Sequence, residues 1–113
     1  GSFYSGSADL SPDFLPMLKK IGQSIAKSGG RITVEGHTDD IPLTGHNRYR
    51  SNWDLSGARA ASVADYLTGD AGVPRERVVV RGMADTHPVA PNDTREGRAK
   101  NRRIEVLVDA YGG

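Results

Sequence analysis

Apolar positions along the chain follow two periods, and together these periods predict seven elements in alternating order. One segment alternates polar and apolar residues, with Ile32 and Val34 on one side, as in a strand with one buried face. Leu18, Ile21 and Ile25 instead recur every three to four positions, which is typical of the buried face of a helix. We therefore expect strands at 3–8, 31–35, 78–80 and 104–108, separated by helices at about 14–28, 51–68 and 93–100.

Local signals set the expected starts of the three helices. Ser51 has the character of an N-cap for the second helix, and Asp54 follows it at the spacing of a capping box. Asn92 or Asp93 is expected to cap the third helix. In the first helix, Pro16 lacks a backbone donor, so we expect a loose first turn before the regular helix.

The alternation of strands and helices predicts an α/β fold of the two-layer sandwich class. Four strands would form one mixed sheet, with the three helices packed on one of its faces. The uninterrupted valines at 78–80 indicate a strand buried on both faces. The long loop at 36–50 follows the carboxyl end of a strand, which is where sheets of this kind usually bind ligands.

Composition and charge narrow the class of protein. With 113 residues the chain is expected to form a single domain at 3–113, preceded by a cloning scar, Gly1-Ser2. Fifteen basic and 14 acidic side chains give a net charge of +1, whereas nucleic-acid-binding domains usually carry a strong basic excess. The sequence has no cysteine for thiol catalysis, no GxSxG motif of a serine hydrolase and no apolar run of about 18 residues that could span a membrane.

The loop after the second strand and the helix that follows it contain the strongest candidates for a ligand site. Asp39 lies just past the strand, where a turn-forming role competes with a role as acceptor for a ligand ammonium. Arg59 shares a helix face with Leu55 and Val63, so its guanidinium needs a partner. That partner is either Asp39 or Glu35 in a structural salt bridge, or a ligand carboxylate held by two hydrogen bonds. A cleft lined by both charges would suit a free amino-acid terminus.

Histidine and aspartate residues in the same loop also suggest a metal. His37, Asp39 and Asp40 could bind an ion with His46 or His87 as a distant third ligand. This pattern lacks the close spacing of an established metal motif, so we expect no metal site.

A basic cluster and a single tryptophan complete the candidates. Arg98, Lys100, Arg102 and Arg103 precede the last strand, and a solvated helix end that favours cations is the simplest interpretation. No aromatic residue interleaves with them, which disfavours nucleic-acid binding. Trp53 is expected to pack against the long loop, with sugar stacking as the alternative.

Several motifs, in order along nearly the whole chain, resemble the OmpA-like peptidoglycan-binding domain. They are SGSADLSP at 5–12, GHTDD at 36–40, NWDLSGARAASV at 52–63, VVVRGMADTHPVAPND at 78–93 and EGRAKNRRIEV at 96–106. Within that family, the SNWDLS string, the long loop before it and the PVAPNDT…GRAKNRR ending are similar to MotB-type flagellar stator subunits.

The resemblance implies a ligand and the residues that hold it. In the family, an aspartate and an arginine at the positions of Asp39 and Arg59 grip the diaminopimelate side chain of peptidoglycan. The same family pattern implies a functional rather than a solvated role for Arg102. The remaining pocket and flanking positions fall on Asn52, Thr38 and Leu55.

The resemblance also implies a role and a setting. The expected function is a non-catalytic peptidoglycan anchor for a flagellar motor stator, working without a cofactor. The alternatives are a general envelope tether of the OmpA or peptidoglycan-associated lipoprotein kind and, less favoured, a metal-dependent peptidoglycan hydrolase. The chain would be the periplasmic domain of a single-pass inner-membrane protein of a Gram-negative bacterium. It would form a homodimer and meet a MotA-type stator subunit through its membrane segment.

Overall fold

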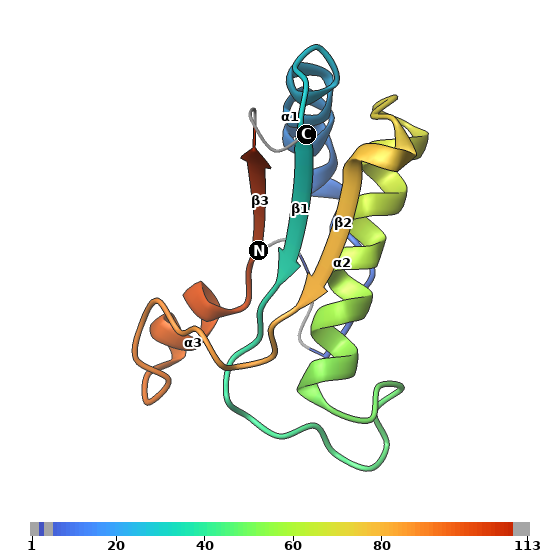
Figure 1. Ribbon diagram of the computed structural model, residues 1–113. Coiled ribbons are helices and arrows are strands. Elements are labelled where there is room, and N and C mark those ends of the chain that lie inside the picture. Colours follow the sequence, from blue (N-terminus) through green and yellow to red (C-terminus); the bar gives the residue numbers. More distant parts are fainter. Residues whose placement is uncertain (1–2, 4–5, 110–113) are drawn as a thin grey trace.

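Three strands and two long helices form two layers in the computed structural model, which describes residues 3 and 6–109 (Figure 1). The predicted α/β class with a mixed sheet is confirmed. In chain order the elements are a 3-10 turn (Pro12–Phe14), α1 (Leu15–Ala26), β1 (Arg31–Gly36), α2 (Asn52–Gly69), a second 3-10 turn (Arg75–Arg77), β2 (Val78–Gly82), α3 (Arg95–Asn101) and β3 (Ile104–Asp109).

The central strand is β1, in the order β2–β1–β3. It pairs in parallel with β2, where Ile32 lies opposite Val78, and in antiparallel with β3, where Ile32 lies opposite Val108. The helices α1 and α2 cover one face of the sheet, and α2 makes the crossover from β1 to β2 (Figure 1). In the same view α3 lies beyond the carboxyl end of β1, so it closes the end of the sheet rather than covering its face.

The prediction of a fourth strand at the start of the chain is wrong for the described residues, where the sheet has three strands. Phe3 forms an isolated antiparallel bridge to Leu10 instead. Gly6 adopts a positive φ of 69°, so the backbone turns back where an extended strand was expected. The prediction also covered residues 4 and 5, which lie outside the described part of the chain.

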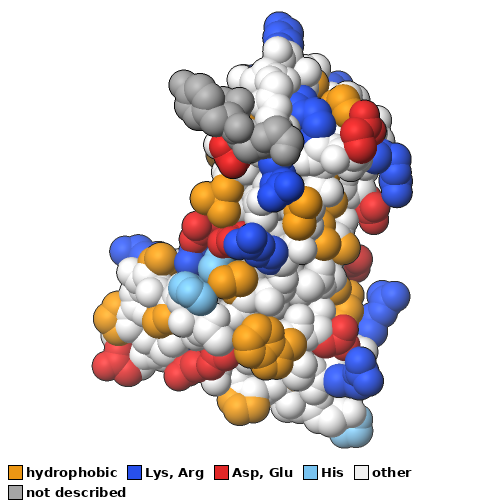
Figure 2. Space-filling view, viewed as in Figure 1, with side chains coloured by type: hydrophobic (Ala, Val, Ile, Leu, Met, Phe, Trp, Pro, Cys, Tyr) orange, Lys and Arg blue, Asp and Glu red, His pale blue; other side chains and the backbone are white. Residues whose placement is uncertain are grey.

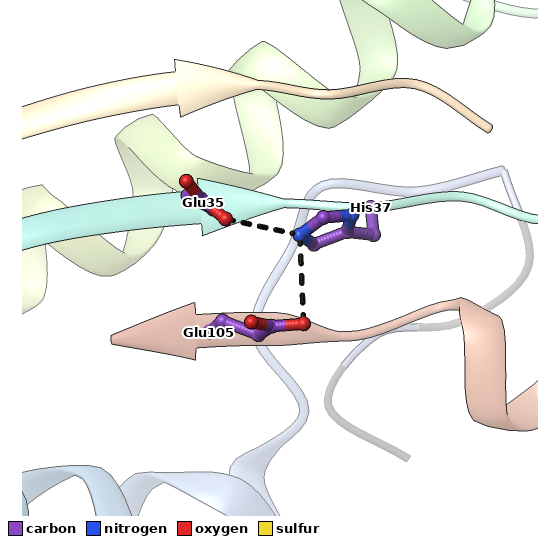
Figure 3. Close-up of side chains that lie close together, drawn as sticks. All are labelled: Glu35, His37 and Glu105. Atoms are coloured by element: carbon purple, nitrogen blue, oxygen red, sulfur yellow. Dashed lines mark ion pairs between the residues drawn. The ribbon is translucent and has the colours of Figure 1, made fainter. Parts of the chain in front are cut away.

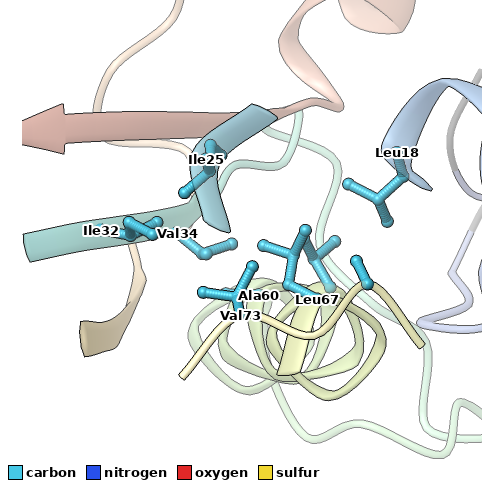
Figure 4. Close-up of a cluster of buried hydrophobic side chains, with 9 residues drawn as sticks. Leu18, Ile25, Ile32, Val34, Ala60, Leu67 and Val73 are labelled. Carbon is cyan, nitrogen blue, oxygen red and sulfur yellow. The ribbon is translucent and has the colours of Figure 1, made fainter. Parts of the chain in front are cut away.

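The core lies between the sheet and the two long helices. Alternate residues of β1, Ile32 and Val34, point toward the helices and are fully buried. They meet apolar side chains from both helices and from the segment before β2 (Figure 4), namely Leu18, Ile25, Ala60, Val63, Leu67, Ala71 and Val73. The periodicity in the sequence therefore identified the buried faces of α1, α2 and β1 correctly.

The prediction that β2 is buried on both faces is wrong. Val79 and Val80 are 42% and 44% exposed. The strand lies at an edge of the sheet, with β1 as its neighbour among the described strands. The uninterrupted valines therefore reflect the high strand propensity of valine and not a central position of β2 in the sheet.

Helix caps were predicted correctly for α2 and incorrectly for α3. Ser51 Oγ accepts a hydrogen bond from the backbone N–H of Asp54 at 3.3 Å, as expected for an N-cap. In α3 the cap is Thr94, whose hydroxyl accepts from the N–H of Gly97 at 3.0 Å. Asn92 or Asp93 was expected there. The side-chain oxygen of Asn92 instead accepts a hydrogen bond from the amide of buried Asn101 at 2.7 Å, which holds the loop before α3 against the helix.

Glycine residues allow α2 to approach the carboxyl ends of β1 and β2 closely. A Cβ added to Gly36 would overlap the carbonyl oxygen of Ser56, and one added to Gly82 would lie 2.7 Å from the backbone nitrogen of Gly57. This close approach brings the start of α2 next to the loop that leaves β1.

Gly36→Ala is expected to lower the free energy of unfolding by about 1–3 kcal/mol, because the added methyl group must displace α2 from β1. Gly57→Ala is the matched control, since a Cβ there meets no atom within 4 Å and the residue is helical. The control should be more stable than wild type by about 0.4–1 kcal/mol. Urea denaturation measures both, and a Gly36→Ala protein as stable as wild type would contradict this packing.

Candidate functional site

Hydrogen bonds fix the start of the β1–α2 loop at the end of the sheet. The N–H of His37 donates to the carbonyl of Arg103, and the N–H of Thr38 donates to the carbonyl of Ala84, both at 2.9 Å. The hydroxyl of Thr38 donates to the carbonyl of Asp39 at 2.8 Å. The position of the Asp39 backbone is therefore tied to the segments next to β2 and β3.

The carboxylate of Asp39 makes two contacts, one that stabilises the turn and one that pairs it with a cation. One oxygen accepts from the N–H of Ile41 at 3.1 Å, which is the turn-forming role expected of an aspartate here. The other accepts from Nη1 of Arg102 at 2.8 Å in a charge-assisted hydrogen bond. Asp39 thus shapes the loop and carries a negative charge at a defined position, so the two roles considered for it are compatible.

Arg59 is buried in α2, with 1% of its surface exposed. Its Nε donates to the carbonyl of Ser7 at 2.8 Å, and its guanidinium carbon lies 5.1 Å from the centre of the Phe3 ring. Burial lowers the pKa of Arg59 to about 10, with a further decrease from Arg102 and an opposing effect of Asp39. The side chain remains a cation at neutral pH.

Asn52, in the first turn of α2, ties the loop to the helix. Its side-chain nitrogen donates to the carbonyl of Ile41 at 3.1 Å and lies 3.5 Å from the carbonyl of Asp39. Leu55 lies one turn further along α2 and is almost fully buried. The helix therefore contributes an amide, an apolar side chain and, another turn on, the guanidinium of Arg59.

One cleft of about 260 Å³ brings all the predicted ligand residues together. Thr38, Asp39, Asn52, Leu55, Arg59 and Arg102 all line it, although Thr38 and Arg102 are 64 positions apart. The other lining residues are Gly6, Ile41, Pro42, Leu43, Thr44 and Asn47.

A family model described as the OmpA family matches residues 2–102 of this chain. The chain belongs to the OmpA family. The resemblance inferred from the sequence motifs is confirmed.

Curated relatives of this OmpA-family domain are longer proteins with different roles. Motility protein B of Bacillus subtilis is 36% identical over 107 residues, which cover 94% of this chain and 41% of that protein. The outer-membrane lipoprotein YfiB of Pseudomonas aeruginosa is 39% identical over 102 residues, covering 89% and 57%. The peptidoglycan-binding protein ArfA of Mycobacterium tuberculosis is 36% identical over 109 residues, covering 96% and 32%. The chain thus spans less than two thirds of each of these relatives.

Solved structures of the same fold include a domain of MotB and the cell wall anchor of a T6SS. The C-terminal domain of Helicobacter pylori MotB superposes with a TM-score of 0.88 at 31% identity, covering 95% of this chain and 81% of that chain. The cell wall anchor of the T6SS from Pseudomonas aeruginosa superposes with a TM-score of 0.85 at 44% identity, covering 96% and 74%.

The OmpA-family domain does not assemble the histidine–aspartate group considered as a metal site. His37 is buried beside Glu35 and Glu105, whereas Asp39 faces the cleft and Asp40 is exposed. Burial lowers the pKa of His37, and the Arg103 cation lowers it further against the opposing effect of Glu105 and Glu35. The imidazole is therefore neutral at pH 7.

The predicted basic cluster divides into structural and cleft residues. Arg98 donates to the carbonyl of Asn92 at 3.0 Å, and Arg103 donates to Glu105 at 2.6 Å. Of these arginines only Arg102 lines the cleft. Basic and acidic side chains are interspersed over the face shown in Figure 2, in keeping with the net charge of +1.

Some features of the site were not found by sequence reasoning. The partners of Arg59, the Ser7 carbonyl and the Phe3 ring, lie more than 50 positions away in the chain. Asn47, whose amide donates to the carbonyl of Gly6 at 3.4 Å, closes the cleft on the loop side. Trp53 was expected to pack against the long loop; it lines a hollow beside the loop and is 60% exposed.

A double-mutant cycle tests whether Asp39 and Arg102 are coupled before any ligand binds. Asp39→Asn and Arg102→Gln should show a coupling free energy of about 1 kcal/mol in urea denaturation, because the pair is half-buried and well aligned. The exposed pair of Arg50 and Asp54, 3.8 Å apart, is the matched control and should give less than about 0.5 kcal/mol. Equal coupling in the two cycles would show that the cleft does not preorganise this pair.

Proposed function

We propose that this domain binds peptidoglycan without catalysis, through the diaminopimelate of the stem peptide. The observation that carries the proposal is the convergence of Asp39, Arg59 and Arg102 on one cleft next to an amide and an apolar side chain. Two relatives support the ligand class by their names, a peptidoglycan-binding protein and a cell wall anchor.

The charges of the cleft match the end of a diaminopimelate side chain, which carries a carboxylate beside an amino or amide nitrogen. Two guanidinium groups face one carboxylate, so the cleft has a positive excess that favours a ligand carboxylate. Arg59 would hold that carboxylate, and Arg102 lies close enough to share it. Asp39 would accept from the ligand nitrogen through its remaining lone pairs. Thr38, Asn52 and Leu55 would then position the ligand.

The expected affinity of one such cleft is modest. Each charge-assisted hydrogen bond contributes about 1.5–3 kcal/mol, and the entropy of association offsets much of the sum. Several copies on one polymer would hold firmly by avidity and still release one at a time. A homodimer would be the smallest such assembly.

Sedimentation with purified diaminopimelate-type sacculi tests the site. Asp39→Asn and Arg59→Gln should each reduce the pelleted fraction at least about tenfold, because each removes a charged ligand contact. Asp40→Asn and Arg48→Gln are matched controls that change the same residue types on exposed loop positions, and they should pellet like wild type. Circular dichroism of every variant separates loss of binding from loss of fold, since Arg59 is buried.

The same assay tests the ligand. Free meso-diaminopimelate should compete with sacculi for the wild-type domain, and sacculi with lysine in place of diaminopimelate should pellet less of it. Equal pelleting by both wall types would contradict the diaminopimelate assignment while leaving wall binding intact. Equal pelleting of wild type, Asp39→Asn and Arg59→Gln would contradict the site.

For the biological role we propose an anchor that holds a flagellar motor stator at the cell wall. Support comes from the SNWDLS string with its long preceding loop, from Motility protein B among the relatives and from MotB among the solved structures. In this role the domain would be periplasmic, joined to a single inner-membrane segment, and would act with a MotA-type subunit. None of the described helices is long and apolar enough to cross a membrane.

Two other anchoring roles use the same cleft chemistry. The T6SS cell wall anchor is 44% identical, more than the 31% of H. pylori MotB, which favours the anchor of a secretion machine as the second candidate. The lipoprotein YfiB represents the general envelope tether.

One chromosomal substitution, Asp39→Asn in the full-length protein, distinguishes these roles by which phenotype appears. A stator anchor predicts loss of swimming with flagella still assembled. A secretion anchor predicts loss of contact-dependent killing with normal swimming, and a tether predicts leakage of periplasmic protein with both activities retained. Normal swimming in this strain would contradict the stator role. Asp40→Asn is the control, because it makes the same substitution at a neighbouring exposed position and should leave all three phenotypes normal.

A further inference from the structure

Three side chains that could hold a metal ion meet on the face of the sheet opposite the helices. Glu35 on β1 lies directly across from Glu105 on β3, and His37 follows at the end of β1 (Figure 3). His37 Nε2 lies 3.4 Å from Oε1 of Glu35 and 3.7 Å from Oε2 of Glu105. All three potential ligand atoms lie within 4.8 Å of one another. These residues lie outside the lining of the cleft.

His37 is the unusual member of this cluster. It is 2% exposed, and within the described part of the chain neither ring nitrogen makes a well-aligned hydrogen bond, although Nε2 lies 3.4 Å from Oε1 of Glu35. Burying a polar nitrogen without a well-aligned partner is costly, and an ion between the two carboxylates would give Nε2 a strong partner. In Figure 3 the ring directs one nitrogen into the space between the two carboxylates.

We propose that Glu35, His37 and Glu105 bind one Zn²⁺ ion, with water completing the coordination. Zinc bonds to histidine nitrogen and carboxylate oxygen at about 2.0–2.2 Å, so neighbouring ligand atoms in a tetrahedral site are roughly 3.4 Å apart. The separations at His37 Nε2 are close to that value, so small side-chain rotations would complete the geometry. Magnesium and calcium prefer all-oxygen sites, which makes an imidazole ligand favour a transition metal.

Two arginines neutralise the facing carboxylates, and they differ in how firmly they are held. Arg103 donates to Glu105 at 2.6 Å and also to the carbonyl of His87 at 2.9 Å. Arg103 holds Oε2, the same oxygen that lies 3.7 Å from His37, so zinc would use the second lone pair of that oxygen. Ligating carboxylates are usually hydrogen-bonded in this way. Arg81 approaches Glu35 at 3.5 Å with a side chain that is 61% exposed. Arg81 is therefore the cation that zinc would displace.

The consequence for the domain would be a brace between β1 and β3 next to the cleft. The His37 N–H already bonds to the carbonyl of Arg103, and the cleft residues Asp39 and Arg102 lie a short distance along the same two segments. Zinc would hold these segments together from the opposite face of the sheet.

Calorimetric titration of the untagged, chelator-treated domain with Zn²⁺ tests the proposal, with Co²⁺ absorption spectra as a second readout. We expect one ion per chain, a tetrahedral Co²⁺ spectrum that zinc removes, and a melting temperature several degrees higher with saturating zinc. Glu105→Gln should weaken binding at least about tenfold, because a lost ligand costs no less than a lost outer-shell partner. This variant is nearly isosteric at a part-exposed position, so it should fold even if the change at buried His37 does not.

Two further variants separate this site from adventitious zinc. His46→Gln, at an exposed loop position, should bind zinc like wild type. Arg81→Gln should bind more tightly than wild type, because the competing cation is gone. The proposal is overturned by no saturation below about 0.1 mM zinc, by unchanged binding in Glu105→Gln, or by loss of binding in His46→Gln.

Discussion

The buried guanidinium of Arg59 is the interaction on which the cleft depends. Removing a cation from water costs several kcal/mol, so the protein must surround it with compensating groups. Those groups come from three separate parts of the chain: the carbonyl of Ser7, the ring of Phe3 and the negative charge of Asp39. Helix α2, the amino-terminal segment and the β1–α2 loop therefore converge on one side chain. If any of these segments moved away, the buried charge of Arg59 would lose a compensating partner.

A second constraint sets the charge of the cleft. Arg102 reaches the carboxylate of Asp39 from the far end of the chain and, at the same time, makes Arg59 a weaker base. Two cations around one anion leave a positive excess that a ligand carboxylate would relieve. Because the residues just before Asp39 are held by hydrogen bonds to the segments next to β2 and β3, the position of this negative charge is tied to the end of the sheet.

What could be predicted from the sequence depended on whether the controlling interaction was local. The start of α2 was predicted from Ser51, and the inward position of Arg59 was predicted from the apolar residues on the same helix face. Both depend only on residues close by in the chain. The edge position of β2 depends on its partners elsewhere in the fold and was missed. The cap at Thr94 is local but was also missed, because the expected cap Asn92 bonds instead to the buried Asn101. Family motifs predicted that Asp39 and Arg102 line one pocket, but their direct hydrogen bond was not predicted, since nothing in their spacing brings together residues 63 positions apart. The opposition of Glu35 and Glu105 requires the strand register, which only the structure supplies.

The carboxyl end of β1 shows why the two faces of one strand can serve different purposes. On the helix side, Gly36 lets α2 approach and so brings Arg59 toward the loop. On the opposite side, Glu35 and His37 lie next to Glu105 of β3, and Arg81 and Arg103 neutralise the two carboxylates. The backbone between them is the same few residues, so any force that tightens the pairing of β1 with β3 also limits how far Asp39 and Arg102 can separate. A ligand that bridges the cleft and a cation that bridges the strands would therefore favour the same closed arrangement, and each would stabilise the arrangement that the other needs.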